Sequence, residues 1–135
     1  MRYLLDTNTC VVYLRWPNSP VARKLATLSP ESVALCAIVK AELHFGVEQS
    51  ARPADNRVAL AAFFAGFASL PFDDRAAEVY GRLRAQLAKR GTPIGPNDLM
   101  IAAIALTNGA TLVTHNVGEF SRVPDLQIED WEATA

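Results

Sequence analysis

Short apolar runs alternate along the chain with longer segments of helical periodicity. Residues 3–5 form a continuous apolar run that ends at Asp6, which is the pattern of a buried strand. Similar runs occur at residues 32–36, 111–114 and 126–129, with a weaker one at 70–72. Because strands alternate with helical segments, the pattern predicts a single α/β domain over residues 1–135, with a mainly parallel central sheet covered by helices on both faces.

The helical segments are separated by polar caps and helix breakers. Helices are expected at about residues 9–16, 20–28, 37–50, 54–68, 73–90 and 97–108. Ser19, Asp73 and Asn97 are the expected N-caps of three of them. The helix that ends before Gly109 is apolar on all sides, so it should be buried in the core.

Composition narrows the class of protein. Half of the 135 residues are hydrophobic and the formal net charge is −1, which excludes disorder and excludes binding to nucleic acid or anionic membranes by bulk charge alone. The two cysteines, Cys10 and Cys36, are too few for a zinc quartet and lie in apolar runs, so they are expected to be reduced core thiols. An early carboxylate and the lack of a long apolar span predict a soluble cytoplasmic protein that does not contact membranes.

Two acidic residues lie where an open α/β sheet places its ligand crevice. Asp6 ends the first strand, and Asp98 lies in the first turn of the most apolar helix. The carboxyl ends of parallel strands and the amino ends of the following helices face one crevice. For Asp98 a structural explanation stands beside the functional one, because the helix dipole favours a negative charge in the first turn.

Glu42 lies within the apolar arc of its predicted helix. At 100° per residue its neighbours on the arc include Ile38 and Phe45, and the polar members of the helix collect on the other side. A lone carboxylate on a core-facing stripe is costly unless it is paired or binds a cation. The alternatives to a site role are a buried ion pair with an arginine and a side chain that reaches solvent at the helix edge.

Three acids at one end of a sheet would repel one another, and a hard cation would relieve that repulsion. Carboxylate oxygens with retained water are the ligand set of Mg²⁺ or Mn²⁺. The chemistry that follows is phosphoryl or phosphodiester hydrolysis, in which the cation activates water and stabilises the leaving oxygen.

Four sequence blocks carry a resemblance to a known family. These are residues 4–8 (LLDTN), 39–46 (VKAELHFG), 96–103 (PNDLMIAA) and 112–116 (LVTHN). In order and spacing they resemble the signature blocks of PIN-domain ribonucleases, specifically the VapC-type toxins of bacterial VapBC toxin–antitoxin pairs. Residues 119–126 and the pair Asp130-Trp131 are also similar to those toxins, so the resemblance covers nearly the whole chain.

This resemblance implies a fold, an activity and partners. It implies a PIN-like three-layer sandwich and Mg²⁺- or Mn²⁺-dependent endonuclease cleavage of RNA. It also implies a homodimer and inhibition by a cognate VapB-type antitoxin whose C-terminal segment wraps the active-site groove, with no direct DNA binding by this chain alone. Carried over by position, Asp6, Glu42 and Asp98 match the metal-binding acids of the family. Thr7 and Asn8 match the turn that holds the first acid, and Thr114 matches a hydroxyl that lines the site.

The chain departs from the family pattern at Asn116, where many members have a fourth acid. Asparagine can ligate a cation but carries no charge. Glu119 resembles an acid that other VapC-type sequences keep in this block, and it is either a substitute ligand or a surface residue beside Phe120. His44 and His115 lie in no pattern that suggests a general base, so they are expected to be structural or solvent-facing.

Basic residues of the long helix are candidates for contacts with the RNA backbone. They are Arg75, Arg82, Lys89 and Arg90. An ordinary solvated helix face is the alternative explanation for these four side chains.

Two other classes of function are consistent with parts of the sequence. A PIN-like scaffold that binds protein with little catalysis is the non-enzymatic one. An aspartyl-phosphate phosphatase or receiver would use Asp6 as its phosphorylated residue. However, Asn8 replaces the second acid of the phosphatase box, and no lysine follows Lys89 as a receiver would require.

Overall fold

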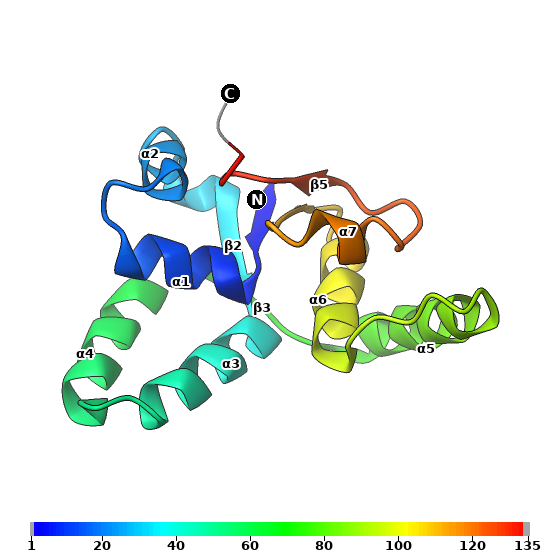
Figure 1. The fold of residues 1–135 in the computed structure, drawn as a ribbon, viewed down its shortest axis with the longest axis horizontal. Helices are drawn as coiled ribbons and strands as arrows, with labels where there is room; N and C mark the ends of the chain where they lie inside the picture. Colours follow the sequence, from blue (N-terminus) through cyan, green and yellow to red (C-terminus); the bar gives the residue numbers. More distant parts are fainter. Residues whose placement is uncertain (1, 134–135) are drawn as a thin grey trace.

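The computed structural model describes residues 2–133 (Figure 1). The strands are β1 (Tyr3–Leu5), β2 (Val33–Cys36), β3 (Ala68–Leu70), β4 (Thr111–Val113) and β5 (Ile128–Glu129). The helices are α1 (Thr7–Arg15), α2 (Pro20–Ala26), α3 (Ala37–Glu48), α4 (Pro53–Phe64), α5 (Asp74–Lys89), α6 (Pro96–Thr107) and α7 (Val117–Phe120), and a 3₁₀ turn covers Pro30–Ser32.

The strands form one parallel sheet in the order β3-β2-β1-β4-β5. Its central strand is β1, which pairs through Tyr3 with Val33 of β2 on one side and Thr111 of β4 on the other. The chain builds one half of the sheet outward from β1 and then returns to the other side of β1 to build the second half. This reversal makes a switch point at the carboxyl end of β1, where open α/β sheets bind their ligands.

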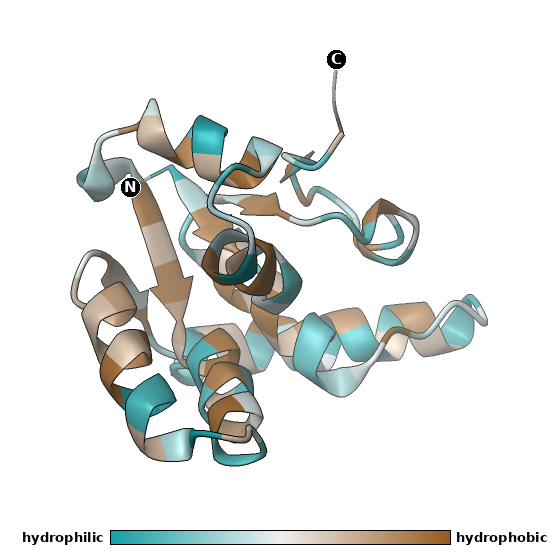
Figure 2. Cartoon of the chain, turned by 60° about the vertical axis from the view of Figure 1, so that its left-hand side comes forward, coloured by the Kyte–Doolittle hydropathy of each residue, from teal (hydrophilic) through white to brown (hydrophobic). Residues whose placement is uncertain are grey.

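The core lies between the sheet and its helices, as the sequence predicted. Every residue of β1 and β2 is buried, and so is the body of α6 from Ile101 to Ala105. The central strands are mostly brown, whereas the helices around them carry alternating brown and teal segments, as expected for helices with one apolar face (Figure 2). In Figure 1, α1, α3 and α4 lie to one side of β1, and α5 and α6 lie to the other. Cys10 and Cys36 are free and buried, which confirms their expected role as core thiols.

The boundary between α4 and β3 was predicted wrongly. The helix ends at Phe64 rather than at residue 68, and the strand spans Ala68–Leu70 rather than 70–72. Pro71 has no N–H to donate to a ladder, so pairing with β2 uses the residues before it. The chain is apolar on both sides of this boundary, so periodicity alone gave no signal of it.

Two predicted helix starts also shift. The first helix begins at Thr7 instead of residue 9, because Asp6 is its N-cap. The helix α6 begins at Pro96, with Gly95 rather than Asn97 as its N-cap. The predicted caps Ser19 and Asp73 are confirmed, since each side chain accepts a hydrogen bond from a backbone N–H in its helix. None of the helices described between residues 2 and 133 is long and apolar enough to cross a membrane.

Candidate active site

Asp6 is fixed at the carboxyl end of β1. Its Oδ1 accepts a hydrogen bond from Thr9 N at 2.9 Å, and its own N–H donates to Val113 O of β4 at 3.0 Å. Thr9 Oγ1 also donates to Val113 O at 3.2 Å. These bonds join β1, β4 and the start of α1, so they hold the carboxylate in place. Only 6% of the residue is exposed.

Glu42 reaches the same point from α3. Thr7 Oγ1, next in sequence to Asp6, donates a 2.6 Å hydrogen bond to Glu42 Oε1. The alternative of a buried ion pair with an arginine is wrong, because no salt bridge within residues 2–133 includes Glu42. The idea that its whole arc faces the core is also wrong, since Glu42 is only partly buried and Phe45 is 64% exposed.

A groove lies between α1, α3 and α4, and it exposes the side of α3 that carries Glu42 and Leu43. It has a volume of about 400 Å³, and its mostly apolar lining includes Val11, Leu14 and Leu43. Thr7 and Glu42 lie among its lining residues. The groove therefore reaches the acidic end of the sheet.

Asp98 is half-buried at the amino end of α6, and its pKa is raised to about 6. Burial is the largest cause, followed by the negative charges of Glu119, Glu42 and Asp6. Three acids from distant parts of the chain therefore act on the Asp98 carboxyl group. Asp6 follows β1, Glu42 lies on α3 and Glu119 lies on α7. This places the sequence-predicted acids Asp6, Glu42 and Asp98 in one electrostatic cluster, together with Glu119.

Glu119 is bound to the site rather than free on the surface. Its Oε1 accepts from Gly95 N at 2.9 Å, and its Oε2 accepts from Asn116 Nδ2 at 2.6 Å. The N–H of Asn116 donates to Oγ1 of the fully buried Thr114 at 3.0 Å. Asn116 thus orients Glu119 toward the Asp98 side of the cluster. This geometry favours the interpretation of Glu119 as a substitute ligand over that of a plain surface residue.

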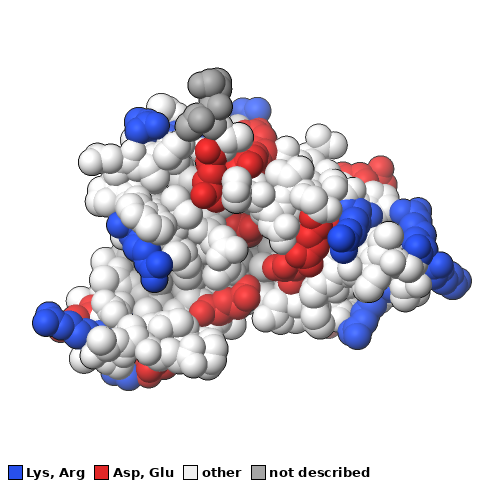
Figure 3. Space-filling model, viewed as in Figure 1, with Lys and Arg blue, Asp and Glu red and all other residues white. Residues whose placement is uncertain are grey.

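The other candidate residues lie further out. Asn8 is exposed on the first turn of α1. The four basic candidates of the long helix, Arg75, Arg82, Lys89 and Arg90, are exposed on α5 and its C-cap. In Figure 3 acidic side chains run across the middle of the face, and most lysine and arginine side chains lie toward its edges. None of the four basic candidates forms a salt bridge with an acid of the cluster in the described chain.

Sequence reasoning missed the contacts that orient two of the acids. It assigned Thr7 to the turn of Asp6, but the hydroxyl of Thr7 also holds Glu42, which is 35 residues away. It did not foresee that the N–H of Gly95 holds Glu119. No local pattern signals either bond, since both depend on how distant segments meet.

The donor set fits a hard divalent cation. Asp6, Glu42, Asp98 and Glu119 offer carboxylate oxygens, and none of the four pairs with lysine or arginine within the described part of the chain. The pKa of Asp98 is raised by burial first and then by the negative charges of its neighbours, and a bound cation would offset both effects. Oxygen ligands of this kind suit Mg²⁺ and Mn²⁺.

Comparison with known proteins identifies the family. The PIN domain family matches residues 3–126. The chain is 38% identical to the tRNA(fMet)-specific endonuclease VapC of Salmonella typhimurium, over 97% of this chain and 98% of the relative. It is also 38% identical to ribonuclease VapC2 of Rickettsia felis, over 98% of this chain and 99% of the relative.

Solved structures agree with this assignment. VapBC2 from Rickettsia felis, bound to a promoter DNA fragment, contains a chain with a TM-score of 0.90 and 37% identity, covering 97% of this chain and 99% of that one. DNA-bound VapBC from Salmonella typhimurium gives 0.92 and 35%, with coverage of 97% and 98%. A likeness of this extent overturns the phosphatase and receiver alternatives. The chain belongs to the PIN-domain family and, within it, to the VapC ribonucleases.

Proposed function

We propose that this ribonuclease is a Mg²⁺- or Mn²⁺-dependent endonuclease toxin in which Asp6, Glu42 and Asp98 hold the cation and Glu119 assists. The observation that supports the proposal is that Asp6, Glu42 and Glu119, none of them paired with lysine or arginine in the described chain, all raise the pKa of the half-buried Asp98 in addition to its burial. When bound, the cation supplies an activated water and stabilises negative charge on the phosphate.

The residues of the chain itself provide orientation. The bond from Thr9 N fixes Asp6, and the hydroxyl of Thr7 fixes Glu42, so neither carboxylate has to be ordered when substrate binds. The bonds from Gly95 and Asn116 restrain Glu119 in the same way. The oxygens are thus preorganised before RNA arrives.

The proposed substrate class is transfer RNA. The Salmonella typhimurium relative is named as a tRNA(fMet)-specific endonuclease and matches over 97% of this chain. Water-mediated hydrolysis with departure of the 3′-oxygen leaves a 5′-phosphate and a 3′-hydroxyl at each cut. The test is to incubate the protein with a labelled total-RNA pool and to map the ends of the fragments. Discrete tRNA fragments with 5′-phosphates support the proposal, whereas 2′,3′-cyclic phosphate ends contradict it, since they arise from attack by the ribose 2′-hydroxyl.

We propose that the RNA backbone follows one face of α5. Arg75, Arg82 and Lys89 are spaced by seven residues, so they lie along one stripe with a drift of about 20° per step. All three are exposed, and none forms a salt bridge within the described chain. Arg90, at the C-cap, extends the basic surface.

Replacement of Arg75, Arg82 and Lys89 by alanine is expected to lower the affinity for RNA. It is also expected to make that affinity depend less on the salt concentration. Three lost phosphate contacts on a single strand lower the slope of log Kd against log salt by about 2. Fluorescence anisotropy with a labelled tRNA, under chelation so that it is not cut, measures this. Arg84→Ala is the matched control, because Arg84 lies on the other side of α5 and donates to Tyr80 Oη. An equal loss in that control would argue against a specific stripe.

Glu119→Gln is expected to lower the pKa of Asp98, because the negative charge of Glu119 is the largest cause of its elevation after burial. The amide oxygen of the variant can still accept from Gly95 N, and a flip of the Asn116 amide lets its Oδ1 accept from the new NH2 group, so the loop is expected to keep its conformation. Carbon-detected NMR of the Asp98 carboxyl in metal-free protein measures the change. An unaltered titration would show that the two groups are not coupled.

We propose that residues 1–135 act as a single domain in a cytoplasmic homodimer that a VapB-type antitoxin neutralises. Similar solved structures are VapBC complexes, which supports the antitoxin, and the DNA in them accompanies the complex rather than a lone VapC chain. The apolar groove that reaches Glu42 suits an amphipathic segment of the antitoxin.

Leu14→Asp is the test, since Leu14 lines this groove and is 43% exposed. We expect it to impair capture of co-expressed antitoxin, with Val58→Asp as an exposed apolar control outside the groove lining.

A further inference from the structure

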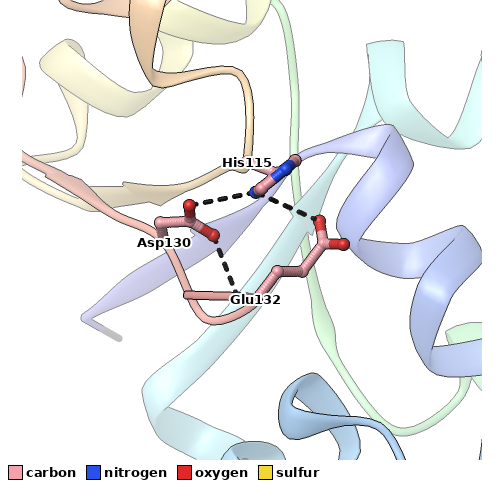
Figure 4. Close-up of side chains that lie close together, drawn as sticks. All are labelled: His115, Asp130 and Glu132. Carbon is pink, nitrogen blue, oxygen red and sulfur yellow. Dashed lines mark hydrogen bonds and ion pairs between the residues drawn. The ribbon is translucent and has the colours of Figure 1, made fainter. Parts of the chain in front are cut away.

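A second group of metal-ligating side chains lies outside the proposed nuclease cluster. His115 follows β4, and Asp130 and Glu132 follow β5 (Figure 4). Because β4 and β5 are parallel neighbours, the segments that leave them emerge side by side. The PIN match ends at residue 126, so two of these three side chains lie beyond it.

The three side chains point toward one another at distances close to those of a metal site. His115 Nδ1 lies 3.0 Å from Asp130 Oδ2 and 3.9 Å from Glu132 Oε2, and all three ligand atoms lie within 4.8 Å of one another. Metal–ligand bonds of about 2.1 Å set ligand atoms about 3.4 Å apart in a tetrahedron. An ion that replaces the hydrogen bond between His115 and Asp130, with small rotations of these two side chains and of Glu132, would therefore complete the geometry.

The carboxylates are prepared for a ligand on their His115 side. Asp130 Oδ1 accepts from Glu132 N at 2.9 Å and Ala133 N at 3.3 Å, which leaves Oδ2 directed at the imidazole. Between the two acids, Trp131 is only 7% exposed, packs edge-on against Tyr3 with centroids 5.2 Å apart and donates to Glu129. This buried anchor fixes the backbone from which both acids project.

The charges also favour a cation. Within residues 2–133 neither Asp130 nor Glu132 forms a salt bridge with lysine or arginine. Arg23 and Lys24 line a pocket together with Asp130, but neither forms a salt bridge with it, and the Arg23 guanidinium donates to Asn18 O at 2.7 Å. The imidazole is therefore the only basic partner of these acids in the described chain.

We propose that His115, Asp130 and Glu132 bind one divalent transition-metal ion of the Zn²⁺ type. One imidazole nitrogen and two carboxylate oxygens suit such an ion better than Mg²⁺, which prefers oxygen ligands alone. The His115 side chain is 63% exposed, so water can fill the remaining positions. The ion joins the segment after β5 to the turn after β4 through ligands that differ from the nuclease acids.

The test uses a full-length, untagged Asp6→Asn/Glu42→Gln/Asp98→Asn protein, in which the nuclease acids lose their charges and keep their size. The chain has two histidines, so imidazole NMR gives one probe at the site and one internal control, His44 on α3. Zn²⁺ is expected to shift the His115 signals with saturation at one equivalent and to leave His44 unchanged. Mg²⁺ at the same concentration is expected to shift neither signal.

Variants of the ligands make the proposal falsifiable. Glu132→Gln in the same background is expected to weaken Zn²⁺ binding by at least about 10-fold, because even the supporting partners of ligands contribute that much. His115→Gln is expected to abolish it, while His44→Gln is expected to bind as the parent does. Circular dichroism checks that each variant is folded. An unmoved His115 signal, equal shifts of both histidines, or undiminished binding by folded Glu132→Gln would each overturn the proposal.

Discussion

Asp98→Asn is expected to reduce RNA cleavage by about 100-fold or more, since loss of a charged cation ligand removes several kcal/mol of transition-state stabilisation and each 1.4 kcal/mol is a factor of ten. Asparagine has the same shape as aspartate, and Asp98 is neither the N-cap of α6 nor half of a salt bridge in the described chain. The fold is therefore expected to persist. The measurement is the single-turnover rate of tRNA cleavage beside the parent.

The same variant is expected to be more stable than the parent above pH 6. The carboxyl of Asp98 has its pKa raised from 3.8 to about 6, so the folded metal-free protein binds this proton more tightly than the unfolded chain does. Its contribution is favourable below pH 4 and is lost as the pH rises through 6. Because the group is half-exposed, we expect a gain of about 1–2 kcal/mol for asparagine at pH 8 and almost none at pH 4.

Urea unfolding in the presence of a chelator, at both pH values, measures this gain. Glu78→Gln is the control, because Glu78 is exposed on α5 and outside the cluster. Cleavage at the parent rate would remove Asp98 from the site. A gain in stability that is the same at pH 4 and pH 8 would show that the neighbouring acids do not act on it.

Removal of divalent cations is expected to abolish cleavage entirely. No lysine or arginine of the described chain neutralises the carboxylates of the cluster, so their negative charges repel a phosphodiester when no cation is bound. Readdition of Mg²⁺ or Mn²⁺ is expected to restore the rate. It should also raise the melting temperature of the parent more than that of Asp98→Asn, because a ligand stabilises only the state that binds it.

Stopped assays after dialysis against chelator, followed by a cation titration, test this expectation. Glu78→Gln again serves as the control and should respond as the parent does. Persistent cleavage by chelated protein would mean that the acids act without a cation. A thermal shift of equal size in Asp98→Asn would place the bound cation elsewhere.

The sequence predicted the parts of this molecule that depend on local pattern. The alternation of buried runs with helical segments indicated one parallel sheet, in which the carboxyl ends of strands and the amino ends of helices face one crevice, so Asp6 and Asp98 were expected on the same side of the sheet. Where the chain is apolar without interruption, from α4 into β3, periodicity failed because both elements are apolar there. The partners of Glu42, Glu119 and His115 were beyond prediction, since they lie 35, 24 and 15 residues away and are set by the paths of loops.

The carboxylate of Asp6 has two roles. It caps α1 by accepting a hydrogen bond from Thr9 N, and it is a proposed ligand of the catalytic cation. Loss of an N-cap costs about 1 kcal/mol, so most substitutions of Asp6 reduce the amount of folded protein as well as its activity. Asp98 is not an N-cap, so its replacement does not remove a capping hydrogen bond. Chains altered at Asp98 are therefore expected to remain as abundant as the parent, whereas chains in which Asp6 is replaced by a residue that does not cap a helix are expected to be less abundant. Two equally inactivating substitutions are thus expected to leave different amounts of folded chain to occupy an antitoxin.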